Sequence, residues 1–185
     1  MMDQPWFRKL FYRPQRLQLE NAQTKADNGD ADAQFGIGLK FASGEGTALD
    51  YAQAASWYLK AANQNHALAQ LNLGTMFASG QGVPQDDDQA LTWILRAAQQ
   101  GDAGAQYKLG LRHLRASRAG FSKNAHESRL EAYKWLQLAS TQGYRSSAAA
   151  FENVALGMTR EEVADGNHRA AAFVAAHPGH TPAQS

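Results

Sequence analysis

Residues 65–100 read NHALAQLNLGTMFASGQGVPQDDDQALTWILRAAQQ, and residues 29–64 align with them without a gap at a period of 36. The two stretches share 17 identical residues, among them an Ala-Gln pair, several glycines, an aspartate, a tryptophan and an Ala-Ala pair. In a third copy Trp135 stands 42 residues after Trp93, so this copy carries six extra residues between its two halves. Self-similarity at a fixed period of this length is typical of solenoid proteins, in which each repeat packs on its neighbours.

Each copy is predicted to form two helices. In the second copy the first helix is expected over residues 66–79, with Ala69, Leu73 and Phe77 on one face at four-residue spacing. Two glycines follow in the sequence SGQG, and glycine can adopt the positive φ that a tight reversal needs. The second helix is expected over residues 86–100. The fold class that follows is all-α, a superhelical solenoid of about three helix pairs.

Helix start and stop signals recur with the repeat. Seven residues before each tryptophan stands an N-cap acceptor, followed three residues later by a capping-box partner: Asp50 with Gln53, Asp86 with Gln89 and Ser128 with Glu131. Just past each second helix stands a residue that tolerates the left-handed conformation: Gly29, Asn65, Gly101 and Gly143. The third copy differs, because Ala116 and Arg118 occupy the positions of the paired glycines. Residues 116–127 are therefore expected to form a longer loop.

The ends of the array are expected to be atypical, because an inner repeat at an end would leave an apolar face in water. The sequence TREE at residues 159–162 predicts a capping box that opens a last helix. The resulting division is an aromatic and basic segment 1–14, an N-terminal capping helix 15–28, repeats 29–64, 65–100 and 101–142, C-terminal capping helices 143–176 and a tail 177–185.

The spaced pattern resembles the Sel1-like repeat, a relative of the tetratricopeptide repeat. Residues 69–74 read AQLNLG, Phe77 follows, and then come GQGV at residues 80–83, Asp86 and ALTWILRAA at residues 90–98. The resemblance covers roughly residues 15–157. It implies a right-handed superhelix of α/α pairs that acts as an adaptor or scaffold for other proteins.

Composition and charge limit the classes of function. The chain has 185 residues and no cysteine, which excludes disulfides and thiolate metal sites and favours a reducing compartment. No apolar stretch approaches the roughly 20 residues of a membrane span, and residues 1–16 lack the pattern of a secretory signal, so a cytoplasmic location is expected. The net charge is +1, but residues 1–16 carry +3, residues 27–102 carry −6 and residues 108–129 carry +5. Such asymmetry bears on the choice of partner.

The sequence contains no convincing catalytic, cofactor or metal motif. The paired glycines lie between two helices and not after a strand, so they are interpreted as turn residues. No two histidines have the i, i+4 spacing of a helical zinc site, and adjacent His126, Glu127 and Ser128 do not have the separation of a triad. We therefore expect no enzyme activity, no cofactor, no metal and no small-molecule substrate. A hydrolase or other small-molecule enzyme on the repeat scaffold is the alternative.

The N-terminal segment leaves three interpretations open. Trp6, Phe7, Leu10 and Phe11 share one helical face, with basic residues elsewhere on the helix. The segment is expected to cover the first helix, to dock a partner or to touch a membrane surface weakly. The last possibility makes a peripheral membrane adaptor the second alternative function.

The function predicted from the sequence is non-catalytic protein binding. The first helices of the repeats are expected to line a concave groove, with Ala33, Ile37 and Phe41 packed inward. The open side then presents ladders of equivalent positions, and the predicted partner-binding residues are Lys40, Asn72, Met76, Lys108, Leu111 and Arg112. The mixture of cations, an amide and apolar groups favours an acidic protein or peptide partner. Nucleic acid is disfavoured, because the aromatic residues of a base-stacking surface are missing.

Overall fold

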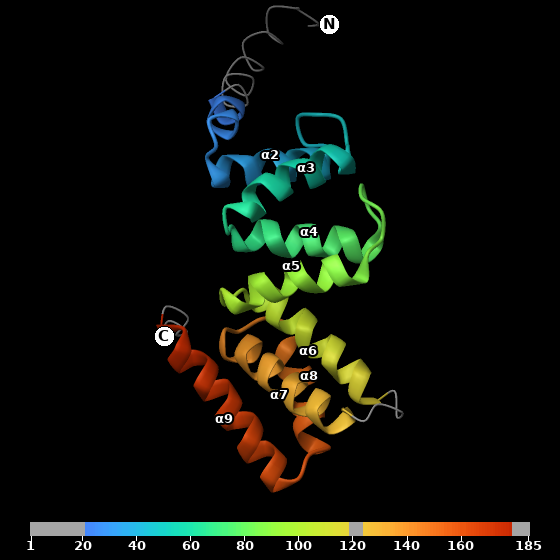
Figure 1. Ribbon diagram of the computed structural model, residues 1–185, viewed down its shortest axis with the longest axis vertical. Coiled ribbons are helices and arrows are strands. Elements are labelled where there is room, and N and C mark those ends of the chain that lie inside the picture. The colour runs from blue at the N-terminus through green and yellow to red at the C-terminus, as the bar shows by residue number, and fades with distance from the viewer. Residues whose placement is uncertain (1–20, 119–123, 179–185) are drawn as a thin grey trace, which may run out of the picture. The chain divides into compact units, whose positions relative to one another are not determined.

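The computed structural model describes residues 21–118 and 124–178, and within these ranges the chain forms helices and turns but no strand (Figure 1). This confirms the all-α fold class. The chain divides into two compact units, residues 1–87 and 88–185, which are here called the N-terminal and the C-terminal unit. The helices are α2 (Ala31–Ser43), α3 (Tyr51–Asn63), α4 (Ala67–Ser79), α5 (Asp87–Gln99), α6 (Ala103–Arg118), α7 (Ala125–Thr141), α8 (Ser147–Leu156) and α9 (Arg160–Ala176).

The N-terminal unit is built from a helical stretch at residues 21–27 followed by α2, α3 and α4, with α3 packed against both α2 and α4. Its core contains Ala26, Ile37 and Trp57, and Ala33 and Phe41 pack against this cluster. The prediction that positions 33, 37 and 41 share the packed face is therefore confirmed. The tryptophans Trp57, Trp93 and Trp135 are 9%, 7% and 4% exposed, so each repeat uses its tryptophan as a core residue.

Two helical glycines mark where the paired helices touch. A Cβ added at Gly38 in α2 would lie 2.6 Å from two ring carbons of Tyr58 in α3. In the C-terminal unit a Cβ added at Gly110 in α6 would lie 2.5 Å from Cγ of Leu136 in α7. Because real side chains do not approach so closely, glycine at these positions sets the spacing of each helix pair.

The turn glycines have the backbone conformation that the sequence predicts. Gly44 and Gly46 have φ of 73° and 74°, and Gly80 and Gly82 have φ of 69° and 73°. At Gly82 there is a second requirement, because an added Cβ would collide with the backbone of Tyr51 and Ala52. The turn after α4 therefore rests directly on the first residues of α3.

The boundaries between repeats combine a left-handed residue with a helix cap. Gly29, Asn65, Gly101 and Gly143 have φ of 94°, 66°, 89° and 72°, which confirms the predicted stop signals. At the first three boundaries the next residue accepts a hydrogen bond from a backbone N–H three residues on: Asp30 from Ala33, His66 from Ala69 and Asp102 from Ala105. Each first helix therefore begins immediately after the reversal that ends the previous helix.

The glutamine of the Ala-Gln pair links each repeat to the preceding helix. Gln34, Gln70 and Gln106 are 5%, 1% and 1% exposed. Their side-chain amides donate to the carbonyl oxygens of Ala26, Ala62 and Ala98 at 3.0, 3.1 and 3.3 Å respectively. A buried glutamine is tolerated here because its amide satisfies a carbonyl near a helix end.

The third repeat differs from the prediction. The expected loop at residues 116–127 is wrong at both ends, because α6 continues through Arg118 and α7 begins at Ala125. Ser128 is therefore not an N-cap but lies inside α7, and Asn124 occupies the cap position. The physical reason is the absence of the paired glycines, without which nothing stops the helix where α2 and α4 stop. The extra residues lengthen both helices: α6 has 16 residues where α2 and α4 have 13, and α7 has 17 where α3 and α5 have 13.

The C-terminal unit ends with α8 and α9, which both pack on α7. Thr159 and Glu162 form the predicted capping box at the start of α9, so this prediction is confirmed. Gly166 of α9 faces the Tyr133 ring so closely that it has no room for a side chain. The predictions for residues 1–14 lie outside the described residues, as do the beginning of helix 15–28 and most of the tail 177–185.

Candidate functional site

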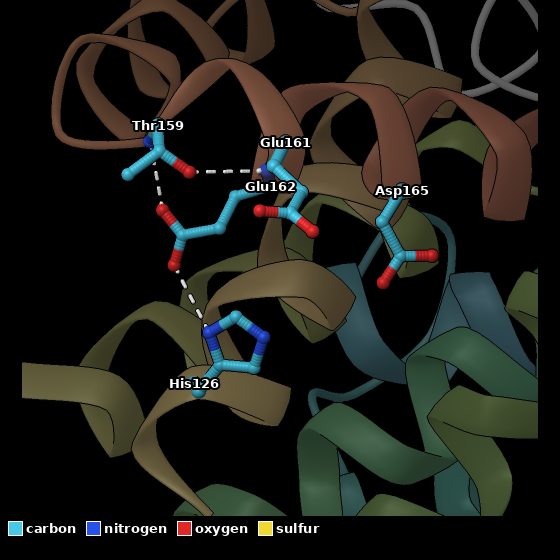
Figure 2. A pocket seen from close by; sticks show the side chains of 5 residues that line it. All are labelled: His126, Thr159, Glu161, Glu162 and Asp165. Atoms are coloured by element: carbon cyan, nitrogen blue, oxygen red, sulfur yellow. Dashed lines mark hydrogen bonds and ion pairs between the residues drawn. The ribbon is translucent and has the colours of Figure 1, made fainter.

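A polar hollow of about 510 Å³ lies between the first turns of α7 and α9, lined by His126, Thr159, Glu161, Glu162 and Asp165 (Figure 2). It brings three acids and a histidine together, so it is where a catalytic or metal site would be sought. The bonding of each side chain decides what the hollow can do.

Glu162 is committed to holding the start of α9. One carboxylate oxygen accepts from the Thr159 backbone N–H at 2.8 Å, and the other lies 3.0 Å from His126 Nδ1 (Figure 2). The second oxygen also lies 3.2 Å from Arg129. These interactions, with the Thr159 hydrogen bond foremost, lower the pKa of the Glu162 carboxyl. A carboxylate stabilised in this way is a structural anion and a poor proton acceptor.

Arg169 provides the second half of the attachment between α9 and α7. Its guanidinium pairs with Glu127 through both nitrogens, and it also lies within ion-pair distance of Glu131 and of Asp165. The bond to Arg169 is the main cause of a lowered pKa at Glu127, and the same bond raises the pKa of Arg169. We call Arg169, Glu127 and Glu131, together with Arg129 and Glu162, the α7–α9 charge network.

This network explains the residues that might suggest an enzyme. His126 is bonded to Glu162 and Glu127 to Arg169, so neither is directed toward Ser128. Among the described residues no group of three or more His, Asp or Glu side chains could hold a metal ion. The hollow in Figure 2 is therefore accounted for by helix capping and by the attachment of α9 to α7.

The predicted residues of the C-terminal unit lie on an exposed face of α6. Lys108 and Arg112 are exposed and Leu111 beside them is half-buried. Arg115, which the sequence prediction omitted, is also exposed, and its spacing of three residues from Arg112 places it on the same face. We call Lys108, Arg112 and Arg115 the α6 basic stripe. Within the described part of the chain none of the three forms an ion pair, whereas Arg118 donates to Asn153.

The predicted residues of the N-terminal unit are less exposed. Lys40 and Asn72 are half-buried, and Met76 is only 5% exposed. Met76 was expected on the open side of the first helices, and its burial corrects that expectation. Lys40 carries its charge toward water at the end of a long stem, whereas the apolar Met76 side chain at the equivalent position of α4 folds onto the core. Leu39, one residue before Lys40, is 43% exposed.

A second hollow lies in the N-terminal unit, and we call it the Tyr58 hollow. It has a volume of about 290 Å³ and brings together residues of α2, α3, α4 and the following turn: Ala42, Tyr51, Tyr58, Asn72, Thr75, Met76 and Gln81. Two of the predicted partner-binding residues, Asn72 and Met76, therefore lie in one concave site. The ladders of equivalent positions on the first helices could not predict this hollow, because Tyr51 and Tyr58 belong to the second helix of a repeat, α3.

His113 stands where the first two repeats have phenylalanine, in the half-buried part of α6. Burial is the main cause of a lowered pKa at His113, which Arg112 and Lys134 lower further and Glu131 and Glu127 partly oppose. His113 therefore behaves as a neutral packing residue near neutral pH.

No helix among the described residues is both long enough and apolar enough to cross a membrane. Comparison with known families matches the Sel1 repeat over residues 31–66, 67–102 and 103–144, together more than half of the chain. No curated protein matches.

Two solved structures are similar. One is a Sel1 repeat protein from Oxalobacter formigenes, with a TM-score of 0.62 and 29% identity, covering 74% of this chain and 98% of that one. The other is c5321, a protective antigen of uropathogenic Escherichia coli strains that displays an SLR fold. Its TM-score is 0.52 at 24% identity, covering 90% of this chain and 44% of that one, and it supports the fold alone.

Proposed function

Because the chain belongs to the Sel1 repeat family, we propose that it is a non-catalytic adaptor or scaffold that binds a protein or peptide partner. Sel1 repeat proteins generally mediate protein–protein interactions, and their fold is typically non-catalytic. What the structure adds is a description of the surfaces that each unit offers to a partner.

The α6 basic stripe carries the proposal. Three cations that face solvent over two turns of one helix, without a carboxylate partner among the described residues, leave a concentrated positive potential. Elsewhere in the same unit, by contrast, Arg129 and Arg169 are paired with acids. A stripe of this kind favours an acidic segment of a partner, with Leu111 supplying apolar contact beside the charges.

The N-terminal unit offers a less charged contact. Lys40 and the exposed Leu39 lie on α2, while Asn72 and Met76 contribute to the Tyr58 hollow. We propose that each unit contacts the partner through its own surface, with charge recognition on α6 and mainly uncharged contacts in the N-terminal unit.

Affinity capture with charge-reversed variants tests the proposal. The full chain and the variant Lys108→Glu with Arg112→Glu are used to capture proteins from a lysate of the source cells, and the captured proteins are quantified by mass spectrometry. The control is Arg145→Glu with Arg160→Glu, since both arginines are exposed and neither forms an ion pair among the described residues. Arg169 is unsuitable as a control because it holds α9 on α7.

The proposal predicts a protein whose recovery falls about tenfold with the α6 variant and is unchanged with the control, while the helical circular dichroism spectrum of both variants is retained. Tenfold corresponds to about 1.4 kcal/mol, a fitting value for reversing two partly exposed charges that each contribute about 0.2–1 kcal/mol. Equal recovery with wild type and the α6 variant for every captured protein would contradict it.

A further inference from the structure

The Tyr58 hollow is held open by the fold of the N-terminal unit. Tyr58 is 2% exposed and its ring centroid lies 5.7 Å from that of Phe35, so the ring at the base of the hollow has a defined position. Met76, 5% exposed, fixes the base from the side of α4. A ligand would therefore find the site largely preformed, which limits the entropy lost on binding.

The rim of the hollow depends on the glycine turn after α4. Gly82 rests on the backbone of Tyr51 and Ala52, where any side chain would collide. This close contact places Gln81 of the turn beside Tyr51 at the start of α3, and both residues line the hollow. The fit of Gly82 against the start of α3 therefore positions this rim.

The chemistry of the lining restricts the ligand. Among the described residues the hollow is lined by two phenols, two amides, a hydroxyl, a thioether and a methyl group, and by no charged side chain. The Thr75 hydroxyl donates to the Leu71 carbonyl oxygen at 2.8 Å and so offers only its lone pairs. A charged ligand group would lose hydration here without gaining an opposite charge.

The size of the hollow restricts the ligand further. Its volume of about 290 Å³ is at the lower end of small-molecule sites, which begin near 300 Å³. The site therefore accommodates one large side chain more readily than a nucleotide or cofactor. Aromatic rings pack favourably against tyrosine rings, and Tyr51 at the rim of the hollow is partly exposed. Aromatic residues are also the commonest anchors of protein interfaces.

We propose that the Tyr58 hollow is a binding site for a single uncharged aromatic side chain presented by the protein partner. This deepens the proposed function and rests on it, because it assigns the N-terminal unit a specific anchor in addition to charge recognition on α6. The partner would then carry an aromatic residue and, elsewhere, an acidic segment.

The test uses small aromatic probes, so that it does not depend on identifying the partner. N-acetyl-tryptophanamide and N-acetyl-tyrosinamide are titrated into the isotope-labelled full chain and followed by NMR, with N-acetyl-aspartate amide as a charged comparison. A ligand of this size should bind with a dissociation constant of about 0.1–0.3 mM, given ordinary ligand efficiency. We expect saturable shifts at Tyr51, Asn72, Thr75 and Gln81 with the aromatic probes, and no saturable shifts with the charged one.

Two variants localise the effect. Ala42→Leu extends a side chain from α2 into the hollow and should weaken the binding of the aromatic probes at least tenfold. Ala78→Leu, at an exposed position of α4 outside the hollow, should leave their affinity unchanged. Dispersed shifts, or equal affinity in the Ala42→Leu variant, would overturn the assignment. A site that opens to the probes only in a Trp6→Ala, Phe7→Ala, Phe11→Ala variant would overturn it too, because the occupant would then be the chain's own N-terminal segment. If the hollow fails this test while the α6 variant still loses its captured protein, only the aromatic anchor is wrong.

Discussion

Gly36 and Gly38 lie two residues apart in α2, and the structure predicts that alanine stabilises the fold at Gly36 but not at Gly38. Both are in a helix interior, where alanine is favoured over glycine by about 1 kcal/mol. A Cβ at Gly36 meets none of the residues that the structure describes within 4 Å. A Cβ at Gly38 would lie 2.6 Å from two ring carbons of Tyr58, which is 2% exposed and packs against the Phe35 ring.

The magnitudes follow from these surroundings. Gly36→Ala should raise the free energy of unfolding by about 0.8–1 kcal/mol, the helix propensity alone. Gly38→Ala gains the same propensity, but the buried ring cannot move aside without disturbing its neighbours, and such overpacking costs about 1–3 kcal/mol. Propensity cancels in the comparison, so the two variants should differ by about 1–3 kcal/mol with Gly38→Ala the less stable.

Urea titration followed by circular dichroism and by tryptophan fluorescence measures this difference, since Trp57 lies in the same unit. A change in melting temperature provides a second measure, at about 2–4 °C per kcal/mol for a chain of this size. Equal stability of the two variants, or higher stability for Gly38→Ala, would show that the contact between α2 and α3 is not as described.

Three further variants probe other contacts. Gln106→Leu removes the hydrogen bonds of Gln106 with the Ala98 carbonyl and the Gln142 amide, so it should lower the free energy of unfolding by about 1–2 kcal/mol in urea titration. The control Gln99→Leu, at an exposed position, should change the free energy of unfolding by less than about 0.5 kcal/mol. Folding lowers the pKa of His113, so as the pH drops His113 is protonated in the unfolded chain before it is protonated in the folded chain. The free energy of unfolding should therefore fall as the pH drops below about 6.5. His113→Phe should remove that part of the fall between pH 7.5 and 5.5, and an unchanged pH dependence would refute it. Arg169→Gln should increase the rate of proteolysis within α9, because this helix loses its ion pair with Glu127 of α7. Arg160→Gln should leave the rate of proteolysis within α9 unchanged.

The helix pairs could be predicted because their signals are local. The tryptophans, the turn glycines and the left-handed residue at each boundary act within a few positions of the chain, and the structure places them as expected. The boundaries of the third repeat could not be predicted in the same way. The prediction extended the second-repeat pattern to Ser128, whereas the absence of paired glycines lets α6 run on to Arg118.

Contacts between distant residues were also beyond the sequence. Arg169 meets Glu127 across 42 positions, and no periodic signal connects the two. For the candidate site, the spacing of Lys108 and Arg112 was enough to place them on one exposed face. Met76 was misplaced because a ladder of equivalent positions assigns the same direction to a methionine and to a cation, whereas the apolar side chain packs inward.

The most direct test of partner recognition is the salt dependence of binding to the purified partner, measured by titration calorimetry for the wild-type chain and for the variant Lys108→Glu with Arg112→Glu. The account predicts that wild-type affinity falls steadily between 50 and 300 mM salt, since the screening length of exposed ion pairs shortens with added salt and passes through about 10 Å at 0.1 M and about 8 Å at 0.15 M. The variant should bind about tenfold more weakly at low salt and show little further loss as salt is added. Equal affinities for the two proteins, both independent of salt, would contradict recognition through the α6 basic stripe.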